Sequence, residues 1–302
     1  MNLAIINARM RSSRFPGKLM QELVDGKSVL EVFLERMKEV KSWDGMVLAI
    51  QKEPENLPLK ALADKMGIPT WESSLPPLAN GAGDVLGRTK EVADHYKANT
   101  IIRVTPDNPT LHRDLISRAC INYYMNRNAC HYVSNCWHRG DNGNGFPRGA
   151  EVEVFSYALL GQMDNETNRP GDRNPPLQVD EPEWKLRQME YDREHVTTWA
   201  RRFPRLIGHA DIVPQTGMQG NTALGLVKFQ ESIPVRLTLD YPEDLEVLRN
   251  VFGELYGKPP IIPDHGVFSL TDIANLYYGN PQKNIPGKPE LFKANQHIQQ
   301  WG

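Results

Sequence analysis

The chain has 302 residues, 40% of them hydrophobic and 24% charged, and its formal net charge at pH 7 is −2. This is an ordinary globular composition, and without a basic excess a protein that coats nucleic acid is disfavoured. No run approaches the ~20 apolar residues of a membrane span, and three cysteines, an odd number, argue against a disulfide framework. We therefore expect no nucleic-acid partner, no membrane association and a cytoplasmic location.

Strands and helices are predicted to alternate along the first part of the chain. Short apolar runs predict buried strands, and apolar residues at helical spacing predict the helices between them. The predicted strands are residues 3–6, 46–50 and 100–104, and the predicted helices are residues 29–40, 58–66 and 85–96. This alternation is typical of a doubly wound α/β fold with a mainly parallel, mixed sheet.

The later part of the chain is less regular. We expect helices over residues 113–126, 193–202 and 242–256, and strands over residues 132–135, 152–156 and 235–239. Residues 162–183 are polar and contain four prolines, which predicts an inserted loop. We take residues 1–260 as one domain that carries this insertion, and residues 261–302 as a peripheral C-terminal segment.

The most informative segment is residues 8–18, Ala-Arg-Met-Arg-Ser-Ser-Arg-Phe-Pro-Gly-Lys, directly after the first predicted strand. Ligands of open α/β sheets bind beyond the carboxyl ends of the strands. Four cations and two hydroxyls in eleven residues suit a triphosphate, because arginine offers several donors and lysine a compact charge. The run matches neither a Walker nor a G-x-G-x-x-G loop, and by composition alone a solvated basic loop fits equally well.

This run resembles the opening of the SpsF-like cytidylyltransferases of spore-coat polysaccharide synthesis, relatives of the CMP-Kdo and CMP-sialic acid synthetases. Segments that look like the family's further motifs follow in order: G-D-V-L-G-R at 83–88, R-V-T-P-D-N-P at 103–109, P-R-G-A-E-V-E-V-F at 147–155, R-E-H-V-T at 193–197 and R-L-T-L-D-Y-P-E-D-L at 236–245. The resemblance implies a fold like that of the nucleotide-diphospho-sugar transferases, with a nucleotidyltransferase domain over residues 1–260.

The activity that the resemblance implies is transfer of CMP from CTP to a sugar acid or related precursor of surface polysaccharide, with release of pyrophosphate. Such a reaction needs a divalent metal, and Mg²⁺ favours one or two carboxylates together with substrate oxygens. Asp107 and Asp240 each follow a predicted strand, and the resemblance implies that they are the metal ligands. On local pattern alone, Asp107 also fits a turn and Asp240 a helix cap. We also expect a homodimer.

The resemblance further implies which residues meet the two substrates. Lys18, Arg14 and Arg9 are expected to be catalytic, with Lys18 stabilising charge during attack. The expected nucleotide-binding residues are Ala8, Arg9, Met10, Ser12, Ser13, Arg14, Lys18, Asp84, Arg88 and Arg103. The expected acceptor-binding residues are Arg148, Gly149, Glu151, Glu153 and His195. Glu151 and Glu153 alternate on one predicted strand and so share a face, which also fits a solvated strand surface, and His195 also fits a structural role.

Several alternatives remain open from the sequence. Arg11 stands where the family usually has a small residue, so it either meets an anionic acceptor or is solvated. The reaction could instead use a phosphorylated or phosphonate small molecule, or the chain could bind nucleotide or sugar without catalysis. A glycosyltransferase usually shows an Asp-x-Asp motif, and this sequence has none. Cys130, His131, Cys136 and His138 are close enough to suggest Zn²⁺, but their spacing matches no usual ligand pair.

Overall fold

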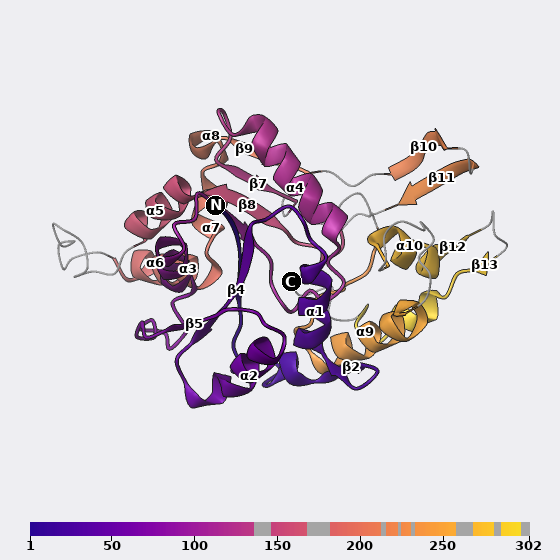
Figure 1. Cartoon of the computed structure of the whole chain (residues 1–302), viewed down its shortest axis with the longest axis horizontal. Coiled ribbons are helices and arrows are strands. Elements are labelled where there is room, and N and C mark those ends of the chain that lie inside the picture. The colour runs from indigo at the N-terminus through magenta and orange to yellow at the C-terminus, as the bar shows by residue number, and fades with distance from the viewer. Residues whose placement is uncertain are drawn as a thin grey trace.

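A seven-stranded sheet with helices on both faces forms the centre of the molecule (Figure 1). In spatial order its strands are β5 (Thr70–Ser73), β4 (Gly45–Gln51), β1 (Asn2–Asn7), β6 (Thr100–Arg103), β8 (Glu153–Ser156), β7 (Tyr132–Ser134) and β9 (His209–Asp211). The computed structural model of the chain describes residues 1–135, 146–167, 182–212, 216–222, 225–230, 233–257, 268–280 and 285–296.

The sheet is mainly parallel, as predicted. Strands β5, β4, β1 and β6 pair in parallel, and β8 runs antiparallel to both of its neighbours, β6 and β7. Because β1 and β6 are parallel neighbours, their carboxyl ends meet at one edge of the sheet. The chain segments that leave these two strands, residues 8–18 and 104–109, are therefore brought together at that edge.

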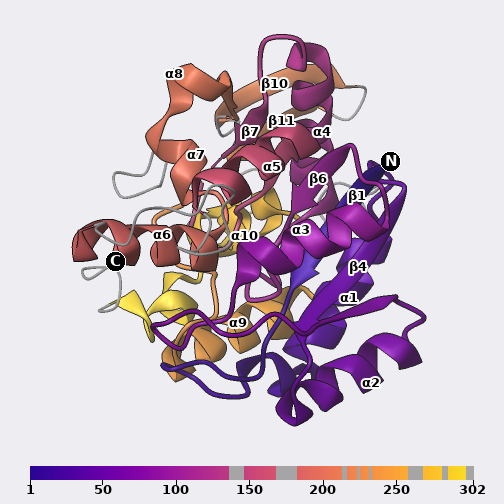
Figure 2. The ribbon, with the colours of Figure 1, turned by 90° about the vertical axis from the view of Figure 1, so that its left-hand side faces the viewer.

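Two hydrophobic clusters, one on each face of the sheet, hold the helices in place. Ile6 of β1 belongs to one cluster, and Leu3 and Ile5 belong to the other, as the alternation of a strand requires. The helices are α1 (Val29–Lys38), α2 (Leu57–Lys65), α3 (Val85–His95), α4 (Arg113–Asn126), α5 (Tyr157–Glu166), α6 (Glu183–His195), α7 (Thr198–Arg202), α8 (Pro204–Ile207), α9 (Pro242–Leu255) and α10 (Leu270–Tyr278). Helices α3, α5 and α6 lie together on the side that faces the viewer in Figure 2.

The predicted helix over residues 193–202 is broken in the structure. Helix α6 ends at His195, and Val196 adopts φ 60° and ψ −63° before α7 begins. The Thr197 amide donates to the His195 carbonyl at 2.7 Å, which closes a tight turn around Val196. A β-branched residue at positive φ is strained, so tertiary packing of the buried Val196 side chain overrides the helical pattern here.

The predicted polar insertion overlaps a helix at each end. Residues 162–166 continue α5, because Leu159, Leu160 and Met163 of that helix are buried against the sheet. Residue 183 already begins α6, and residues 168–181 lie outside the described part of the chain. The prediction of a loop over residues 162–183 is therefore wrong at both ends.

The predicted strand over residues 235–239 is an extended segment that joins no sheet. Its hydrogen bonds go to two different partners: the Leu237 amide donates to the Arg148 carbonyl at 2.6 Å, and the Leu239 amide donates to the Asp107 carbonyl at 2.8 Å. A ladder needs one continuous partner strand, so only an isolated bridge between Arg148 and Arg236 forms. The segment nevertheless ties three of the sequence motifs together.

The segment after residue 260, predicted to be peripheral, contributes to the larger hydrophobic cluster. Phe268, Ile273 of α10 and Phe292 are buried in it with the α9 residue Phe252, whose ring meets that of Phe268 at 5.0 Å. The sequence prediction failed here because the stretch is polar on average, although a few of its large apolar residues occupy core positions. Strands β10 (Thr216–Thr222) and β11 (Gly225–Gln230) form a hairpin beside the main body in Figure 1. Within the described chain, no helix has the length and apolarity to span a bilayer.

Candidate active site

The loop after β1 is held by hydrogen bonds of its backbone amides, and the side chains of Arg9, Arg11 and Arg14 remain exposed. The buried Ala8 donates its amide to the Ala49 carbonyl at 3.0 Å, and the Met10 amide donates to Asn56 Oδ1 at 2.9 Å. The Gly17 amide closes the loop on the Met10 carbonyl at 2.9 Å. Gly17 has φ 71°, a conformation that glycine adopts readily. The chain turns at this residue, so Lys18 lies at the edge of the sheet.

Lys18 brings the two predicted metal ligands together. Its Nζ lies 3.1 Å from Asp107 Oδ2 and 3.2 Å from Asp240 Oδ1, and it also donates to the Leu239 carbonyl. Burial opposes a charge on Asp240, but Lys18, Arg14 and Arg236 together hold the pKa of its carboxyl below the ordinary value. The two carboxylates therefore converge on one cation, although they are far apart in the sequence.

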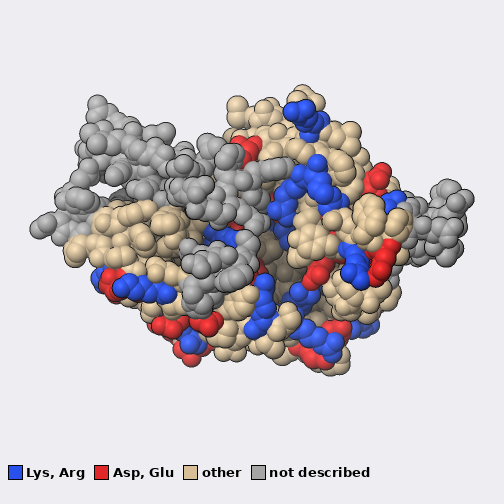
Figure 3. All heavy atoms as spheres, turned by 180° about the vertical axis from the view of Figure 1, so that it is seen from behind, with Lys and Arg blue, Asp and Glu red and all other residues tan. Residues whose placement is uncertain are grey.

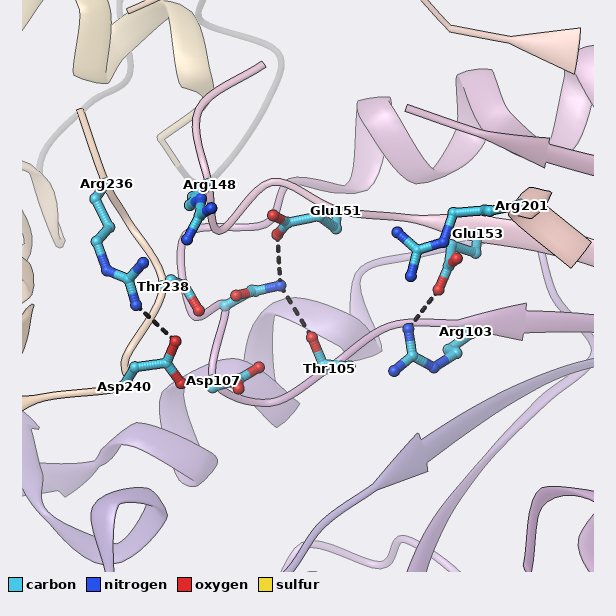
Figure 4. Close-up of a pocket in the computed structure, with 11 residues that line it drawn as sticks. Arg103, Thr105, Asp107, Arg148, Glu151, Glu153, Arg201, Arg236, Thr238 and Asp240 are labelled. Atoms are coloured by element: carbon cyan, nitrogen blue, oxygen red, sulfur yellow. Dashed lines mark hydrogen bonds and ion pairs between the residues drawn. The ribbon is translucent and has the colours of Figure 1, made fainter. Parts of the chain in front are cut away.

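A cavity of about 260 Å³ opens beside this cation. Its lining is almost entirely polar, and the close-up shows carboxylates and guanidinium groups from several segments pointing into it (Figure 4). The lining residues are Arg103, Thr105, Asp107, Asn108, Arg148, Glu151, Glu153, Arg201, Arg236, Thr238 and Asp240. Seen from behind, that face of the molecule is hollowed near its middle, and Lys and Arg side chains gather around the hollow (Figure 3).

The three arginines of the loop point in different directions. Arg14 reaches the site, with Nη2 at 2.8 Å from Asp240 Oδ1, and Arg9 pairs with Glu194 at 3.2 Å. Arg11 pairs with Glu55 at 2.5 Å, away from the cavity lining. The structure thus places Arg11 on the protein surface, outside the cavity lining. Ser12 Oγ accepts from the Phe15 amide at 3.4 Å, which is turn chemistry, and Ser13 is exposed.

Two predicted nucleotide-binding residues are buried next to β1. Asp84 caps α3 by accepting from the Gly87 amide at 2.8 Å, and it pairs with Arg193 at 2.7 Å. Arg88 donates from Nε to Asn7 Oδ1 at 2.9 Å, and no carboxylate of the described residues forms an ion pair with it. Burial, with Arg9 nearby, lowers the pKa of Arg88 to about 10. A buried guanidinium without a carboxylate partner is suited to an anionic ligand.

The two glutamates of the predicted acceptor set differ in their environment. Glu153 is buried and accepts from Tyr132 Oη and Thr197 Oγ1, each at 2.5 Å, and from Arg103 Nη1. Burial opposes its charge, yet Arg103 and Arg201 hold the pKa of its carboxyl below the ordinary value. Glu151 Oε2 accepts from the Gly149 amide at 2.8 Å and from Asn108 Nδ2 at 3.0 Å. Both glutamates line the cavity, so neither belongs to a solvated strand face.

Gly149 and His195 do not themselves line the cavity. Gly149 has φ 100°, and a side chain there would meet the Leu237 carbonyl carbon at 2.3 Å. Only glycine lets these two segments meet closely enough to place Arg148 beside Thr238 (Figure 4). The His195 ring packs against the Tyr191 ring at a tilted angle, with centroids 4.3 Å apart. Burial lowers its pKa against the influence of Glu194, with Arg103, Arg201 and Arg9 adding to the effect, so the imidazole is neutral at pH 7.

Comparison with known proteins identifies the group to which this site belongs. The family model of the cytidylyltransferases matches residues 3–258. The chain belongs to the cytidylyltransferase family. It is 24% identical to the spore coat polysaccharide biosynthesis protein SpsF of Bacillus subtilis over 289 residues, which cover 92% of this chain and 95% of that protein. It is thus an SpsF-like cytidylyltransferase, a nucleotidyltransferase enzyme.

Solved structures confirm the fold predicted for this cytidylyltransferase. A cytidylyltransferase from Leptospira borgpetersenii has a TM-score of 0.69 at 22% identity, with 97% of this chain and 96% of that chain covered. A CMP:2-keto-3-deoxy-manno-octonic acid synthetase complexed with CTP has a TM-score of 0.51 at 13% identity, with 84% of this chain and 98% of that chain covered. Both therefore share the arrangement of strands and helices described above.

Sequence reasoning missed some lining residues of the cytidylyltransferase site. Arg236 donates from Nη2 to Asp240 Oδ2 at 2.6 Å and from Nε to Asp244 Oδ1 at 3.0 Å. The sequence did contain a signal for Arg236, because this residue begins the motif at 236–245 and lies four residues before Asp240. Arg201 had no usable signal, since its place in the cavity depends on the break between α6 and α7. Thr105, Asn108 and Thr238 also lie within the matched motifs and were not singled out.

The suggested zinc cluster is only partly covered by the described chain. Cys136 and His138 lie outside it, and no group of three potential metal ligands occurs among the described residues. Cys130 donates from Sγ to the Tyr132 carbonyl at 2.9 Å, and burial raises the pKa of its thiol. Burial also raises the pKa of Cys120 to about 12. Both thiols are therefore protonated, which does not favour metal binding.

Proposed function

We propose that this enzyme transfers CMP from CTP to a sugar acid or related precursor of surface polysaccharide, with Mg²⁺, and releases pyrophosphate. The main observation behind the proposal is that Lys18 contacts both Asp107 and Asp240, and that these two carboxylates line an arginine-rich cavity. This combination offers a cation for the triphosphate, a carboxylate pair for its metal ion, and an adjoining charged cavity for the acceptor. The relationship to SpsF supports a role in polysaccharide synthesis.

The nucleotide is proposed to lie along the loop of residues 8–18. The exposed side chains of Arg9 and Arg14 would bind its phosphates, and the buried Arg88 would supply a further donor below the loop. The related synthetase whose structure contains CTP supports this choice of nucleotide. The acceptor oxygen attacks the α-phosphorus, its new P–O bond forms as the bond to pyrophosphate breaks, and the acceptor proton passes to solvent. Lys18 stabilises the charge that grows on the phosphates.

The residues present fit a magnesium ion bound together with the triphosphate. The Lys18 ammonium lies 3.1 Å from Asp107 and 3.2 Å from Asp240, so the two carboxylates converge on one position, and this supports a metal ion shared between them. Two carboxylates are what Mg²⁺ usually takes from a protein, the remaining ligands being substrate oxygens and water. When bound, the ion would neutralise phosphate charge and lower the barrier to attack.

The cavity suits an acceptor that carries both hydroxyls and an anionic group. Glu151 already accepts hydrogen bonds from one side, and its carboxylate can accept from an acceptor hydroxyl as well. Arg148 and Arg201 lie on the cavity wall with it (Figure 4). Their guanidinium groups match a carboxylate or a phosphate in bidentate geometry. The neutral His195 behind the wall is proposed to shape this region through packing.

The decisive experiment is a screen of CTP, UTP, ATP and GTP against a panel of sugar acids and phosphorylated metabolites, read as pyrophosphate release with Mg²⁺. We expect release only with CTP and an anionic acceptor, and calorimetry should show CTP binding most tightly. Equal affinity for all four nucleotides would defeat the cytidine assignment and leave the nucleotidyltransferase class intact. Transfer of sugar from a nucleotide-sugar, without pyrophosphate, would overturn the proposal.

The arginine-rich lining also favours a second candidate, transfer to a phosphorylated or phosphonate small molecule. Its phosphate would take the place proposed for the sugar carboxylate, because both anions suit the same guanidinium groups. The same panel separates the two, since it contains both acceptor classes. We also propose that the protein is a homodimer, which sedimentation or light scattering can test directly.

A further inference from the structure

One residue of the C-terminal segment reaches the metal-binding side of the site from behind. Asn295 lies beyond residues 3–258, the part of the chain that matches the family model, and its residue exposure is 1%. Its amide Nδ2 donates to the Arg236 carbonyl at 3.0 Å and to Asp244 Oδ1 at 3.0 Å. A side chain more than fifty positions along the chain therefore bonds directly to the segment that carries Asp240.

Asp244 links Asn295 to the candidate metal ligand. Its carboxylate is buried and accepts hydrogen bonds from four donors: the Asp240 amide at 2.8 Å, the Tyr241 amide at 2.9 Å, Arg236 Nε at 3.0 Å and Asn295 Nδ2. Arg236 in turn donates to Asp240 Oδ2 at 2.6 Å. Asn295 therefore bonds to the Asp244 carboxylate that holds the Asp240 amide, and to the backbone carbonyl of Arg236, whose guanidinium holds the Asp240 carboxylate.

We propose that Asn295 is a positioning residue that orients Asp240 for metal binding through Asp244 and Arg236. Only the donor side of its amide is used, because its Oδ1 is buried and has no hydrogen-bond partner among the described residues. Without that donor, the Oδ1 of Asp244 retains Arg236 as its one partner in the described part of the chain, and the guanidinium can rotate away from Asp240. Magnesium demands nearly ideal octahedral geometry, so a small rotation of this carboxylate weakens binding. The inference rests on the proposed function, since it takes Asp240 as a ligand of the metal.

The chain offers a matched control for a merely structural role. Asn250 of α9 donates from Nδ2 to the Leu291 carbonyl at 3.1 Å, which holds the same C-terminal segment against the same helix. It has no hydrogen bond to Arg236, Asp240 or Asp244. Asn250→Ala therefore loosens the segment without touching the network behind Asp240.

The test is a titration of the full-length protein with Mn²⁺ in the presence of CTP, read by electron paramagnetic resonance, beside thermal unfolding of each variant. We expect Asn295→Ala to weaken Mn²⁺ binding about 10-fold, as is typical when a group that supports a metal ligand is removed. Asn250→Ala should stay within about two-fold of the wild type. Asn295→Ser retains one hydroxyl donor, so its Mn²⁺ affinity should lie between those of the wild type and Asn295→Ala. If the alanine variant unfolds, the serine variant still allows the measurement.

Two results would overturn the inference, and they differ in whether the proposed function is overturned as well. Wild-type Mn²⁺ affinity in Asn295→Ala, or equal losses in Asn295→Ala and Asn250→Ala, would reduce Asn295 to a structural residue and leave the proposed function standing. Failure of the wild-type protein itself to bind Mn²⁺ with CTP would overturn the proposed function, and this inference with it.

Discussion

The two charged regions around the site differ in how freely their side chains can change partners. In the loop of residues 8–18, the side chains of Arg9 and Arg14 are 47% and 51% exposed, and each makes one ion pair with the described residues. Behind Asp240, the side chain of Arg236 is only 3% exposed and bonds to two carboxylates. Exposed ion pairs contribute about 0–1 kcal/mol, whereas removing one partner of a buried pair costs about 3–5 kcal/mol. The loop can therefore exchange its partners for phosphates, and the buried network keeps its geometry.

Lys18 connects the two regions. It belongs to the loop in sequence, yet its side chain is 12% exposed and its ammonium lies between Asp107 and Asp240. In this position it neutralises the two carboxylates that the proposed function gives to the metal. The four predictions below test this division between an adaptable loop and a rigid network, beginning with the residue that joins them.

The largest effect is expected from Lys18→Ala. Loss of a cation aimed at the reacting phosphates should lower kcat by roughly 1,000-fold. The same change should tighten Mn²⁺ binding in the absence of nucleotide, because the ammonium no longer competes for the carboxylates. Steady-state rates and a Mn²⁺ titration measure the two effects. A variant that keeps a tenth or more of the wild-type kcat would show that the catalytic cation lies elsewhere.

Asp107→Asn and Asp240→Asn come next. Each removes one carboxylate of the proposed metal site and keeps the size of the side chain, so turnover should fall at least ~100-fold while the fold survives. Circular dichroism checks the fold and steady-state kinetics the rate. Near-normal turnover in either variant would remove that residue from the metal site, and for Asp240→Asn it would also leave the buried network with a purely structural role.

A smaller, pH-dependent effect is expected from Glu153→Gln, which probes the buried charges on the other wall of the cavity. The pKa of Glu153 is held below its ordinary value of 4.5. Its charge therefore stabilises the fold above about pH 4.5, and this contribution disappears as the pH falls through the native pKa. Chemical denaturation should show the wild type more stable than the variant at neutral pH, with the difference shrinking on acidification. A constant difference down to about pH 3 would contradict this pKa shift.

The smallest effect is expected from Arg11→Ala. Arg11 is the most exposed of the loop arginines and pairs with Glu55 rather than with the cavity, so kcat and both KM values should stay within about two-fold of the wild type. Arg14→Ala is the matched comparison, since Arg14 is similarly placed in the loop but pairs with Asp240. A rise in the KM of the acceptor for Arg11→Ala alone would return this residue to the acceptor site.

The local sequence was sufficient to predict those features of the structure that depend on residues close together in the chain. The alternation of apolar runs predicted the core strands and a mainly parallel sheet, and the helix over residues 113–126 has the predicted bounds. The basic run after β1 was predicted to face a ligand, and it does lie at the carboxyl edge of the sheet. The motif that contains Asp240 also contains Arg236 and Asp244, so these two residues could be located from the sequence as well.

Tertiary structure decided everything that depends on contacts between distant segments. Val196 leaves the helical conformation because its buried side chain packs in the core, and this break places Arg201 in the cavity. The residues around Asn295 are mostly polar, and the sequence predicts a peripheral segment. In the structure Phe292 is buried in the core, and Asn295, three residues later, lies within hydrogen-bond distance of Asp244. Hydrophobic burial and long-range hydrogen bonds outweigh local preferences at these positions. The sequence by itself therefore determined the fold class and the loop proposed to bind the nucleotide, and only folding decided which side chains complete and support the candidate site.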